Sequence, residues 1–568
     1  MIGYVCKYTP VEMLEAMGAE PVLIEPSVTD FDLADTLMYP NVCSYVKGVL
    51  EDVVAKDYEG VVLTTCCDSV RRLCDVLRAQ YPKKFIRMLD VPRLATDTAA
   101  ELYAARLRKL GEDYEAFSGR RFDGDRLREL LSCRACGGQA ARRAAPGGLR
   151  LGLAGARCGN GLRNMLEDRG AEIVLDMTCT GAERRFSPPE GNEDLLKSYA
   201  GQLLGQLPCL RMADASGREK QLEASADRLD GILCHTVKFC DSYSYEYAAL
   251  RRRAKIPVLR LETDTTRQCE GQIRTRVEAF LEALAAAKGK KPVARESGNG
   301  GKKSIIVVGI DSGSTSTNAV VMNGKKEILA SGSIRTGAKT AVSAEKIFAE
   351  VLQKAGVSRD GVGLVVSTGY GRVSIPFAER NVTEISCHGK GARYFNPRVR
   401  TILDIGGQDS KAIRLNAKGE VADFVMNDKC AAGTGRFLEA MARTLELDIS
   451  ELGPVSLKAA EAAEISSMCT VFAESEVISL IARNREKSDI AAGVHRAIAG
   501  KACSLLSRVG PEPEFMMTGG VARNPGVVKA VEERLGAKLF LCEDPEIVGA
   551  VGAALFGLES LETSKKPV

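Results

Sequence analysis

Two aspartates in the second half of the chain stand directly before glycine-rich turns. Asp404 begins the turn Asp-Ile-Gly-Gly-Gln-Asp, and Asp311 begins the turn Asp-Ser-Gly-Ser-Thr-Ser-Thr. Glycines let backbone N–H groups approach an anion, and carboxylates bind Mg²⁺ directly or through water. One such pattern is typical of an ordinary hairpin turn, but here it occurs twice, each time between two apolar runs. The repetition predicts a duplicated fold with two phosphate-binding hairpins.

Two facing hairpins of this kind resemble the superfamily of acetate and sugar kinases, heat-shock chaperone ATPases and actin. The resemblance implies a duplicated ribonuclease H-like ATPase fold and a separate glycine turn for adenosine, which residues 517–524 supply. On this basis the candidate catalytic residues are Asp311, Asp404 and Gln408, with ATP and Mg²⁺ as ligands. The candidate ATP-binding residues are Ser312, Gly313, Ser314, Thr315, Gly406, Gly407, Gly519, Gly520 and Asn524.

Cysteine-containing segments flank the central turn at residues 384–392 and 427–437. Together with residues 368–372 and 465–476, they make this half similar to the activator ATPases of 2-hydroxyacyl-CoA dehydratases and benzoyl-CoA reductases. The resemblance implies a homodimer bridged by one [4Fe–4S] cluster on two cysteines from each subunit, matched to Cys387 and Cys430. Cys430 precedes a helix expected to begin near Gly433, whose N-terminus would favour a thiolate.

In the first half of the chain, two segments place Cys-Asp-Ser after an apolar strand and before a helix. The segment EGVVLTTCCDSV contains Cys67, and the parallel segment DGILCHTVKFCDSY contains Cys240. Ligands of open α/β sheets gather at this edge. We expect Asp68 and Asp241 to be the helix N-caps, with the two thiolates in the positive field of the helix starts.

The elements that must position these cysteines alternate between strand and helix, which predicts parallel sheets covered by helices on both faces. Expected strands at residues 3–6, 21–24 and 60–65 alternate with helices, and a second copy of the pattern has strands at 149–154, 172–176, 231–235 and 257–262. The fold class is therefore α/β, with an N-terminal pair of Rossmann/flavodoxin-like parallel-sheet domains.

Motifs around Cys6, Cys43, Cys67, Cys179 and Cys240 make this half similar to the dehydratase component of the same enzyme system. The resemblance implies a [4Fe–4S] cluster on Cys43, Cys67 and Cys240. A sub-branch binds a double-cubane [8Fe–9S] cluster, to which Cys6 and Cys179 would contribute. The sixth ligand stays open between three cysteines, namely Cys66, Cys158 and Cys234.

The family usually carries a longer helical insert where this chain has a short basic stretch at residues 132–148. The substrate site of the family therefore does not carry over to this chain. Cys133 and Cys136 form a single Cys-x-x-Cys pair, for which a redox or metal pair and a loop with incidental cysteines are equally good interpretations.

Length and composition bound the remaining possibilities. The 568 residues require several domains, and 78 Lys+Arg against 74 Asp+Glu favour neither nucleic acid nor a membrane surface as a partner. We expect a cytoplasmic protein, because the sequence shows no signal peptide or membrane span. In that reducing compartment 18 cysteines with three histidines favour iron–sulfur ligation over disulfides or zinc. Four cysteines look like small buried hydrophobic residues, namely Cys74, Cys209, Cys503 and Cys542.

The predicted organisation is a first α/β domain at 1–130, a basic connection at 131–148, a second α/β domain at 149–286, a flexible linker at 287–303, a two-lobed ATPase at 304–560 and a tail at 561–568. We expect ATP binding to drive low-potential electrons from a donor such as ferredoxin or flavodoxin to a small-molecule substrate, either a 2-hydroxyacyl-CoA or another compound. Alternatives are a small-molecule kinase, a nucleotide-gated binding module with structural zinc, and an activator whose N-terminal half is a scaffold without a cluster.

Overall fold

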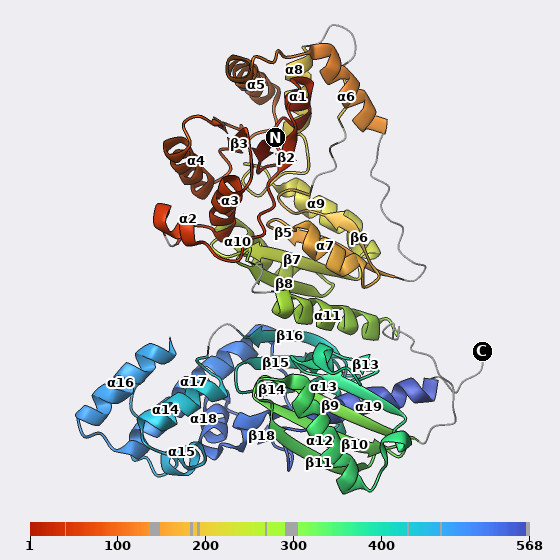
Figure 1. Ribbon diagram of the computed structural model, residues 1–568, viewed down its shortest axis with the longest axis vertical. Coiled ribbons are helices and arrows are strands. Elements are labelled where there is room, and N and C mark those ends of the chain that lie inside the picture. Colours follow the sequence, from red (N-terminus) through yellow and green to blue (C-terminus); the bar gives the residue numbers. More distant parts are fainter. Residues whose placement is uncertain are drawn as a thin grey trace. The chain divides into compact units, whose positions relative to one another are not determined.

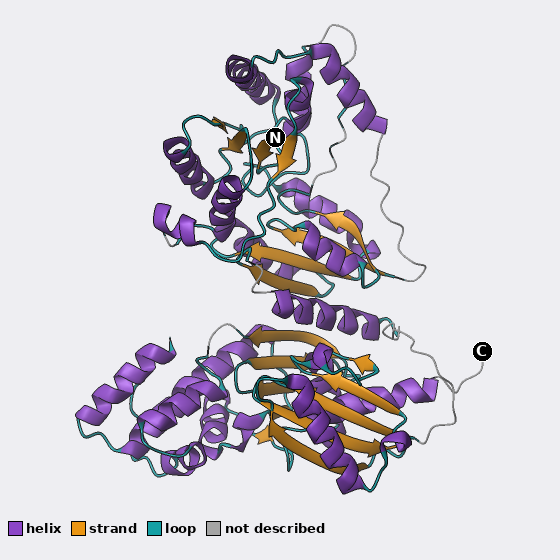
Figure 2. Cartoon of the chain, in the orientation of Figure 1, coloured by secondary structure: helices purple, strands orange, loops and turns teal. Residues whose placement is uncertain are grey.

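The computed structural model (Figures 1 and 2) describes residues 1–39, 41–136, 148–181, 184, 186–189, 194–266, 270–289, 305–428, 431–465 and 469–563. The chain forms two compact units, Met1–Val277 and Glu278–Val568, and the boundary falls within helix α11 (Glu270–Ala287). Most of the predicted linker lies outside the described residues. The predicted basic connection begins inside a helix, because α6 (Gly124–Cys136) continues past residue 131.

The first unit contains two four-stranded parallel sheets with the same topology, which confirms the prediction of paired α/β domains. The strand orders are β2-β1-β3-β4 and β6-β5-β7-β8, so in each sheet the first and third strands are neighbours. The strands are β1 (Ile2–Tyr4), β2 (Pro21–Leu23), β3 (Gly60–Thr64), β4 (Phe85–Leu89), β5 (Leu149–Gly155), β6 (Ala171–Asp176), β7 (Gly231–Val237) and β8 (Val258–Thr263). Both β3 and β7 are buried along their whole length, as expected for parallel strands covered on both faces.

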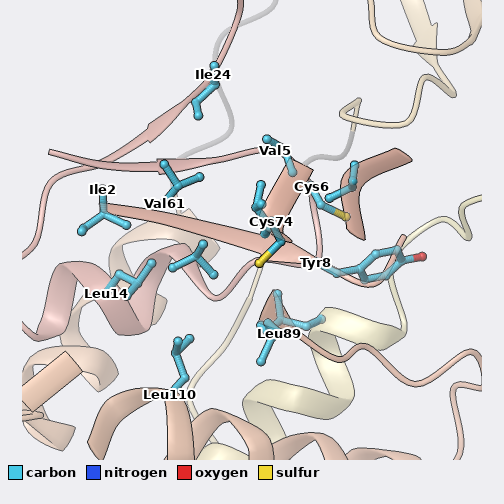
Figure 3. Close-up of a cluster of buried hydrophobic side chains, with 14 of the residues drawn as sticks. Ile2, Val5, Cys6, Tyr8, Leu14, Ile24, Val61, Cys74, Leu89 and Leu110 are labelled. Carbon is cyan, nitrogen blue, oxygen red and sulfur yellow. The ribbon is translucent and has the colours of Figure 1, made fainter. Parts of the chain in front are cut away.

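Helices connect these parallel strands. They are α1 (Val11–Ala16), α2 (Asp32–Leu37), α3 (Ser44–Ala55), α4 (Asp68–Gln80) and α5 (Asp97–Ser118) in the first half of the unit, and α7 (Asn160–Glu167), α8 (Leu195–Leu204), α9 (Ser216–Ser225) and α10 (Asp241–Arg253) in the second. The largest core of this unit contains Cys6 and Cys74 beside aliphatic side chains from the first sheet and its helices (Figure 3).

The second unit repeats one five-stranded sheet twice. Its strand orders are β11-β10-β9-β12-β13 and β16-β15-β14-β17-β18. The strands are β9 (Ile306–Ser312), β10 (Ser316–Asn323), β11 (Ile328–Arg335), β12 (Leu364–Thr368), β13 (Arg380–Asn381), β14 (Thr401–Ile405), β15 (Ser410–Leu415), β16 (Val421–Asn427), β17 (Phe515–Thr518) and β18 (Leu539–Phe540). In each sheet the first three strands are antiparallel and the others are parallel, which is the duplication that the sequence predicts.

The helices of the second unit are α12 (Thr340–Ala355), α13 (Glu384–Phe395), α14 (Gly435–Thr444), α15 (Ile449–Ser456), α16 (Thr470–Ala482), α17 (Lys487–Val509), α18 (Pro525–Leu535) and α19 (Val548–Thr563). Alternate residues of β9 face different helices: Val308 packs with α12, and Val307 packs with α19. Helix α19 also lies close to α13, because a Cβ on Gly552 would meet the carbonyl oxygen of Cys387 at 1.9 Å. Among the described helices, none combines the length and the apolar composition that a membrane crossing requires.

Candidate ATP site and thiol cluster

The two predicted phosphate hairpins face each other in the second unit. One turn joins β9 to β10, and the other joins β14 to β15. A Cβ on Gly407 would lie 2.1 Å from Oγ1 of Thr315, so the second turn approaches the first as closely as a glycine allows. Each turn is closed by a backbone hydrogen bond, from Gly313 N to Ser316 O and from Gly406 N to Asp409 O. The hairpins therefore form the two sides of one site.

The predicted adenosine turn adjoins the second hairpin. Gly519 has φ +84°, and a Cβ there would lie 2.5 Å from the carbonyl oxygen of Ile405, so the close approach requires glycine. Gly520 begins the short 3₁₀ helix that follows. The side chain of Asn524 caps α18 by accepting hydrogen bonds from Gly526 N and Val527 N. Its side-chain oxygen is therefore used by the protein rather than directed to a nucleotide.

The other predicted hairpin side chains differ in their surroundings. Gln408 and Ser314 are exposed, and both are accessible to a ligand. Ser312 is buried, and its hydroxyl lies 3.2 Å from that of Thr317 within the sheet. Ser312 therefore helps to hold the turn, whereas Ser314 and Gln408 are free to contact what the turn binds.

A buried ionic network lies between the hairpins. Lys411 Nζ is 3.1 Å from Asp404 Oδ2, 2.8 Å from Asp409 Oδ2 and 3.7 Å from Glu384 Oε1. His388 lies between the two catalytic candidates, with its ring nitrogens 3.8 Å from Asp311 Oδ2 and from Asp404 Oδ1. The residues present fit Mg²⁺ with a phosphate, because carboxylate oxygens and a lysine cation meet at glycine turns.

The two aspartates titrate in opposite directions. Burial raises the pKa of Asp311 to about 8, and the negative charges of Glu384 and Asp404 add to the effect. Burial opposes ionisation of Asp404 as well, but His388, Lys411 and a hydrogen bond from Thr518 outweigh it and lower its pKa to about 2. Lys411 supplies the lasting positive charge, since burial lowers the pKa of His388 and leaves its ring neutral at pH 7.

Four residues of this site were not predicted from the sequence. They are Glu384, His388, Lys411 and Thr518. Lys411 gave the clearest available signal, because it is a lysine in the strand that directly follows the second hairpin turn. Its role depends on the strand register, which places it opposite Asp404.

The structure contradicts the matching of Cys387 to a ligand that bridges two subunits. Cys387 has no exposed surface and packs against Val366, Val382 and Ala553 inside the second unit. Burial also raises the pKa of its thiol well above the ordinary value. A ligand shared with a second subunit has to lie at the surface, and Cys387 does not. Cys430 lies outside the described residues.

Cys469 was overlooked in the sequence, although it belongs to the segment 465–476 that was matched to the activator ATPases. It is the partly exposed N-cap residue of α16. The following apolar residues are exposed as well: Val471 by 66%, Phe472 by 63% and Ile478 by 55%. A thiol at a helix start beside an uncovered apolar face suits a contact between subunits better than Cys387 does.

The predicted cysteines of the first unit gather in its largest core. Cys6, Cys43, Cys66, Cys67, Cys179, Cys209 and Cys240 all belong to this one cluster. The thiol of Cys66 hydrogen-bonds to Cys6 and to Cys67 and lowers the pKa of each to about 6. The backbone bond from Ser44 N to Lys238 O brings the start of α3, where Cys43 is the N-cap, beside the loop of Cys240.

The helix starts at these thiols differ from the prediction in one respect. The N-caps of α4 and α10 are Cys67 and Cys240 themselves, and the helices begin at Asp68 and Asp241. The thiols therefore lie one position closer to the free backbone N–H groups than expected. Hydrogen bonds from the backbone of Val70 and Ser69 help to lower the pKa of Cys67.

The structure separates the three candidates for a sixth ligand. Cys66 lies among the other thiols, whereas Cys234 packs in a different core. Cys158 is buried beside Arg163 and Glu25, and burial raises its pKa to about 12. Cys209, which was expected to be a structural residue, lies near Cys179 instead, with its sulfur 3.3 Å from Tyr243 Oη.

The spacing of these thiols bears on the kind of metal site. Within the described part of the chain, no group of three or more His, Cys, Asp or Glu is placed to hold a single metal ion. Thiolates that hold a multi-iron cluster bind different iron atoms, so they need not converge on one point. The donors that share this core are thiols, which is the ligand type that iron–sulfur clusters use. Cys133 is exposed on α6, and the side chain of Cys136 lies outside the described residues.

A cavity of about 510 Å³ lies beside the turn that carries Cys66 and Cys67. Thr65 directly precedes these cysteines, and Arg71 lies on the first turns of α4. Arg93 adds a second cation, while Leu94 and Leu102 make part of the wall apolar. Cavities of this size and mixed lining accept small organic molecules.

Comparison with known proteins divides the chain as the structure does. Residues 308–557 match the BadF/BadG/BcrA/BcrD ATPase family, and residues 6–145 and 133–284 match the 2-hydroxyglutaryl-CoA dehydratase D-component family. The 2-hydroxyisocaproyl-CoA dehydratase activator of Clostridioides difficile is 42% identical over 264 residues, which is 46% of this chain and 99% of that protein. The chain belongs to the BadF/BadG/BcrA/BcrD ATPase family. Its N-terminal half matches the 2-hydroxyglutaryl-CoA dehydratase D-component family, so the chain is a fusion of the two family regions.

Two further proteins are similar to the ATPase half of the chain. The (R)-2-hydroxyglutaryl-CoA dehydratase activating ATPase of Acidaminococcus fermentans is 44% identical over 254 residues, covering 44% of this chain and 97% of that protein. The solved structure of the Clostridium difficile activator with bound ADPNP is 40% identical and covers 46% of this chain and 99% of that chain, with a TM-score of 0.44. Each of these relatives corresponds to the ATPase half alone, so the N-terminal half is what this chain adds.

Proposed function

We propose that this ATPase uses ATP hydrolysis to deliver low-potential electrons to the iron–sulfur module formed by its own N-terminal half. The module acts on a 2-hydroxyacyl-CoA or another small molecule, and the electrons come from a donor such as ferredoxin or flavodoxin. The fusion supports this proposal, because a tether raises the effective concentration of electron donor for acceptor. We place the protein in the reducing cytoplasm, and the 15 cysteines whose side chains the structure describes form no disulfide with one another.

One contact carries the proposal. Gly435 N and Arg436 N at the start of α14 donate hydrogen bonds of 2.9 Å to the carbonyl oxygens of Gly406 and Gly407. The turn expected to receive phosphate therefore also holds the helix that follows Cys430. A nucleotide that shifts this turn has to shift the start of α14 as well, which links the ATP site to the Cys430 segment.

We propose that the contact with a second subunit is formed by this same region. We propose that Cys430 and Cys469 of each of two subunits hold a shared [4Fe–4S] cluster, in place of the pair Cys387 and Cys430. The exposed apolar residues Val471, Phe472 and Ile478 of α16 support a homodimer, because an uncovered apolar face beside the shared thiols is the expected character of an interface. When bound, such a cluster supplies one-electron transfer.

The N-terminal thiols would hold either a [4Fe–4S] cluster or a double-cubane [8Fe–9S] cluster. Cys43, Cys67 and Cys240 are the ligands proposed for a single cubane. Cys6, Cys66 and Cys179 complete a set of six for the larger cluster, since all six share one core. The cavity beside Cys66 and Cys67 is the proposed place of the small-molecule acceptor, and Arg71 and Arg93 favour one that carries a negative charge.

Metal analysis of the full-length chain, purified without oxygen, tests the proposal. About ten irons per chain would indicate a double cubane with half of a shared cluster, and about six would indicate a single cubane with that half. Mg·ATP should then change the rate at which a low-potential donor reduces the protein. A colourless protein that phosphorylates a small molecule, or one that holds zinc, would overturn the proposal.

Single cysteine variants separate the two versions of the shared cluster. We expect Cys469→Ala and Cys430→Ala each to lose about two irons per chain and to favour the monomer. Cys387→Ala and the control Cys503→Ala, on helix α17, should keep both. Loss of the shared iron in Cys387→Ala alone would restore the original matching.

A further inference from the structure

Arg157 occupies the position in the second sheet that Cys6 occupies in the first. The two sheets have the same strand order, and Cys6 lies two residues after β1, just as Arg157 lies two residues after β5. Both strands are first in their sheet and adjacent to the third, where ligands of open α/β sheets bind. Arg157 therefore lies at the edge of the second sheet that corresponds to the edge where Cys6 lies in the first sheet.

The backbone around Arg157 is fixed by a close approach between strands. Gly155 has φ +97°, and a Cβ there would lie 2.1 Å from the carbonyl oxygen of His235. That same oxygen accepts a hydrogen bond of 2.7 Å from Ala156 N. Only glycine allows this turn, which sets the direction in which the chain leaves β5.

The guanidinium of Arg157 stacks on an aromatic ring and leaves its donors unused. Its central carbon lies 3.9 Å from the ring centroid of Tyr45, which is itself held by a hydrogen bond of 2.8 Å to the carbonyl oxygen of Ile24. Among the described residues, the guanidinium makes no ion pair and no hydrogen bond. A partly buried cation with five N–H donors and no acceptor is an incomplete arrangement.

Thiols lie near this cation, as does the ring of Tyr45. Tyr45, Cys179, Cys6 and Cys66 favour the charged form of Arg157 against the effect of its burial and raise its pKa. In turn, Arg157 contributes to the lowered pKa of Cys6, and it partly offsets the burial that raises the pKa of Cys179 to about 12. Two other cations lie near these thiols: Lys7, which donates to the carbonyl oxygen of Leu207, and Arg211, whose charge helps to lower the pKa of Cys67. Arg157 differs from Lys7 in that all of its donors are available for whatever these thiols hold.

We propose that Arg157 donates hydrogen bonds to sulfur atoms of the N-terminal iron–sulfur cluster, raises its reduction potential and slows its loss of iron. This inference rests on the proposed N-terminal cluster. Reduction adds negative charge to an anionic group, so a fixed cation beside its sulfurs stabilises the reduced form. Arg157 would thus be a positioning and tuning residue in one sheet, where the symmetry-related residue of the other sheet, Cys6, is a ligand.

The test compares Arg157→Gln and Arg157→Lys with the control Arg169→Gln, an exposed arginine of the same half of the unit. The full-length protein, loaded with iron without oxygen, is titrated for its midpoint potentials, and the release of iron to a chelator is timed. The shared cluster of the ATPase half serves as an internal reference. We expect Arg157→Gln to have a more negative N-terminal potential and about tenfold faster iron release, with Arg157→Lys between it and the wild type.

The remaining outcomes each have a definite meaning. A purely structural role on Tyr45 would lower the unfolding temperature of the iron-free protein and leave the potential unchanged, which would overturn the inference. If Arg157→Gln holds no N-terminal iron, Arg157→Lys decides: wild-type potential and release would overturn the inference, and a change in either would support it. A wild-type protein without N-terminal iron would overturn the proposed function first, and this inference with it.

Discussion

The two hairpins of the ATP site share one topology but give their aspartates different cross-strand partners. Asp311 in β9 and Asp404 in β14 are each the last residue but one of their strand, in sheets of the same topology. The strand register places Asn318 opposite Asp311 and Lys411 opposite Asp404. Equivalent threonines, Thr368 and Thr518, lie on the other side.

This difference explains the opposite pKa shifts. Lys411 neutralises Asp404 within the protein, whereas Asn318 brings no charge and its side-chain oxygen has no hydrogen-bond partner among the described residues. Helix α19 buries Asp311 further, since a Cβ on Gly549 would lie 2.1 Å from Asp311 Oδ2. Asp404 is thus a permanent anion, and Asp311 is one only when a proton leaves or a cation arrives. Duplication has given one carboxylate of each kind.

Removing Lys411 should have the largest effect, on the stability of the protein. Lys411→Met leaves the buried carboxylates of Asp404 and Glu384, and the partly exposed one of Asp409, without this cation, which costs about 3–5 kcal/mol of unfolding free energy. Urea unfolding of the full-length protein measures this loss. The exposed Lys418, between β15 and β16, provides the control, because Lys418→Met should be nearly neutral. Equal stability of the two variants would show that Lys411 does not hold the network together.

Replacing either aspartate should have the next largest effect, on the rate of ATP hydrolysis. Asp404→Asn should slow Mg·ATP hydrolysis at pH 7 by on the order of 10²-fold, because it removes a charge that the site keeps ionised. Asp311→Asn should cost less at pH 7, where Asp311 is mostly protonated, and more at pH 9. Phosphate release at the two pH values measures both. Equal losses for the two variants at pH 7 would contradict the assignment of unequal charge.

The pH dependence of nucleotide binding should also reflect the different pKa values of Asp311 and Asp404. A proton has to leave Asp311 before the carboxylate can bind Mg²⁺, and its pKa is about 8. Affinity for Mg·ATP should therefore rise with pH, by up to about tenfold per unit below pH 8, and then level off. Calorimetric binding between pH 6 and pH 9 shows this rise. In Asn318→Lys, which copies the partner of Asp404, the rise should move to lower pH; an unchanged profile would contradict the explanation.

The threonine pair gives the smallest effect. Thr518→Val removes the hydrogen bond of 2.9 Å to Asp404 and should cost about 1 kcal/mol of stability. Thr368 has a hydroxyl without a hydrogen-bond partner among the described residues, so Thr368→Val should cost less. Thermal unfolding of the two variants tests the difference. A larger loss for Thr368→Val would mean that its hydroxyl has a role in the first hairpin.

The sequence predicted the parts of the site that are local patterns. The hairpins around Asp311 and Asp404, the adenosine turn at Gly519 and the cysteines that end strands in the first unit could all be found, because glycine turns and strand ends are written in consecutive residues. The duplication followed from repeated patterns, and the structure confirms it in both units. The roles of the individual cluster ligands stay predictions. The match of Cys387 to a ligand of the shared cluster is corrected, because its side chain is buried.

The sequence by itself determined the fold class, the family and the positions of the phosphate turns, since each depends on short-range spacing and composition. Only the tertiary structure decided which charges and thiols meet. Strand register placed Lys411 opposite Asp404, the packing of α19 buried Cys387, and the equivalence of two sheets brought Arg157 to the thiols. Burial and charge pairing depend on residues far apart in the chain, so they cannot be predicted from the local sequence pattern.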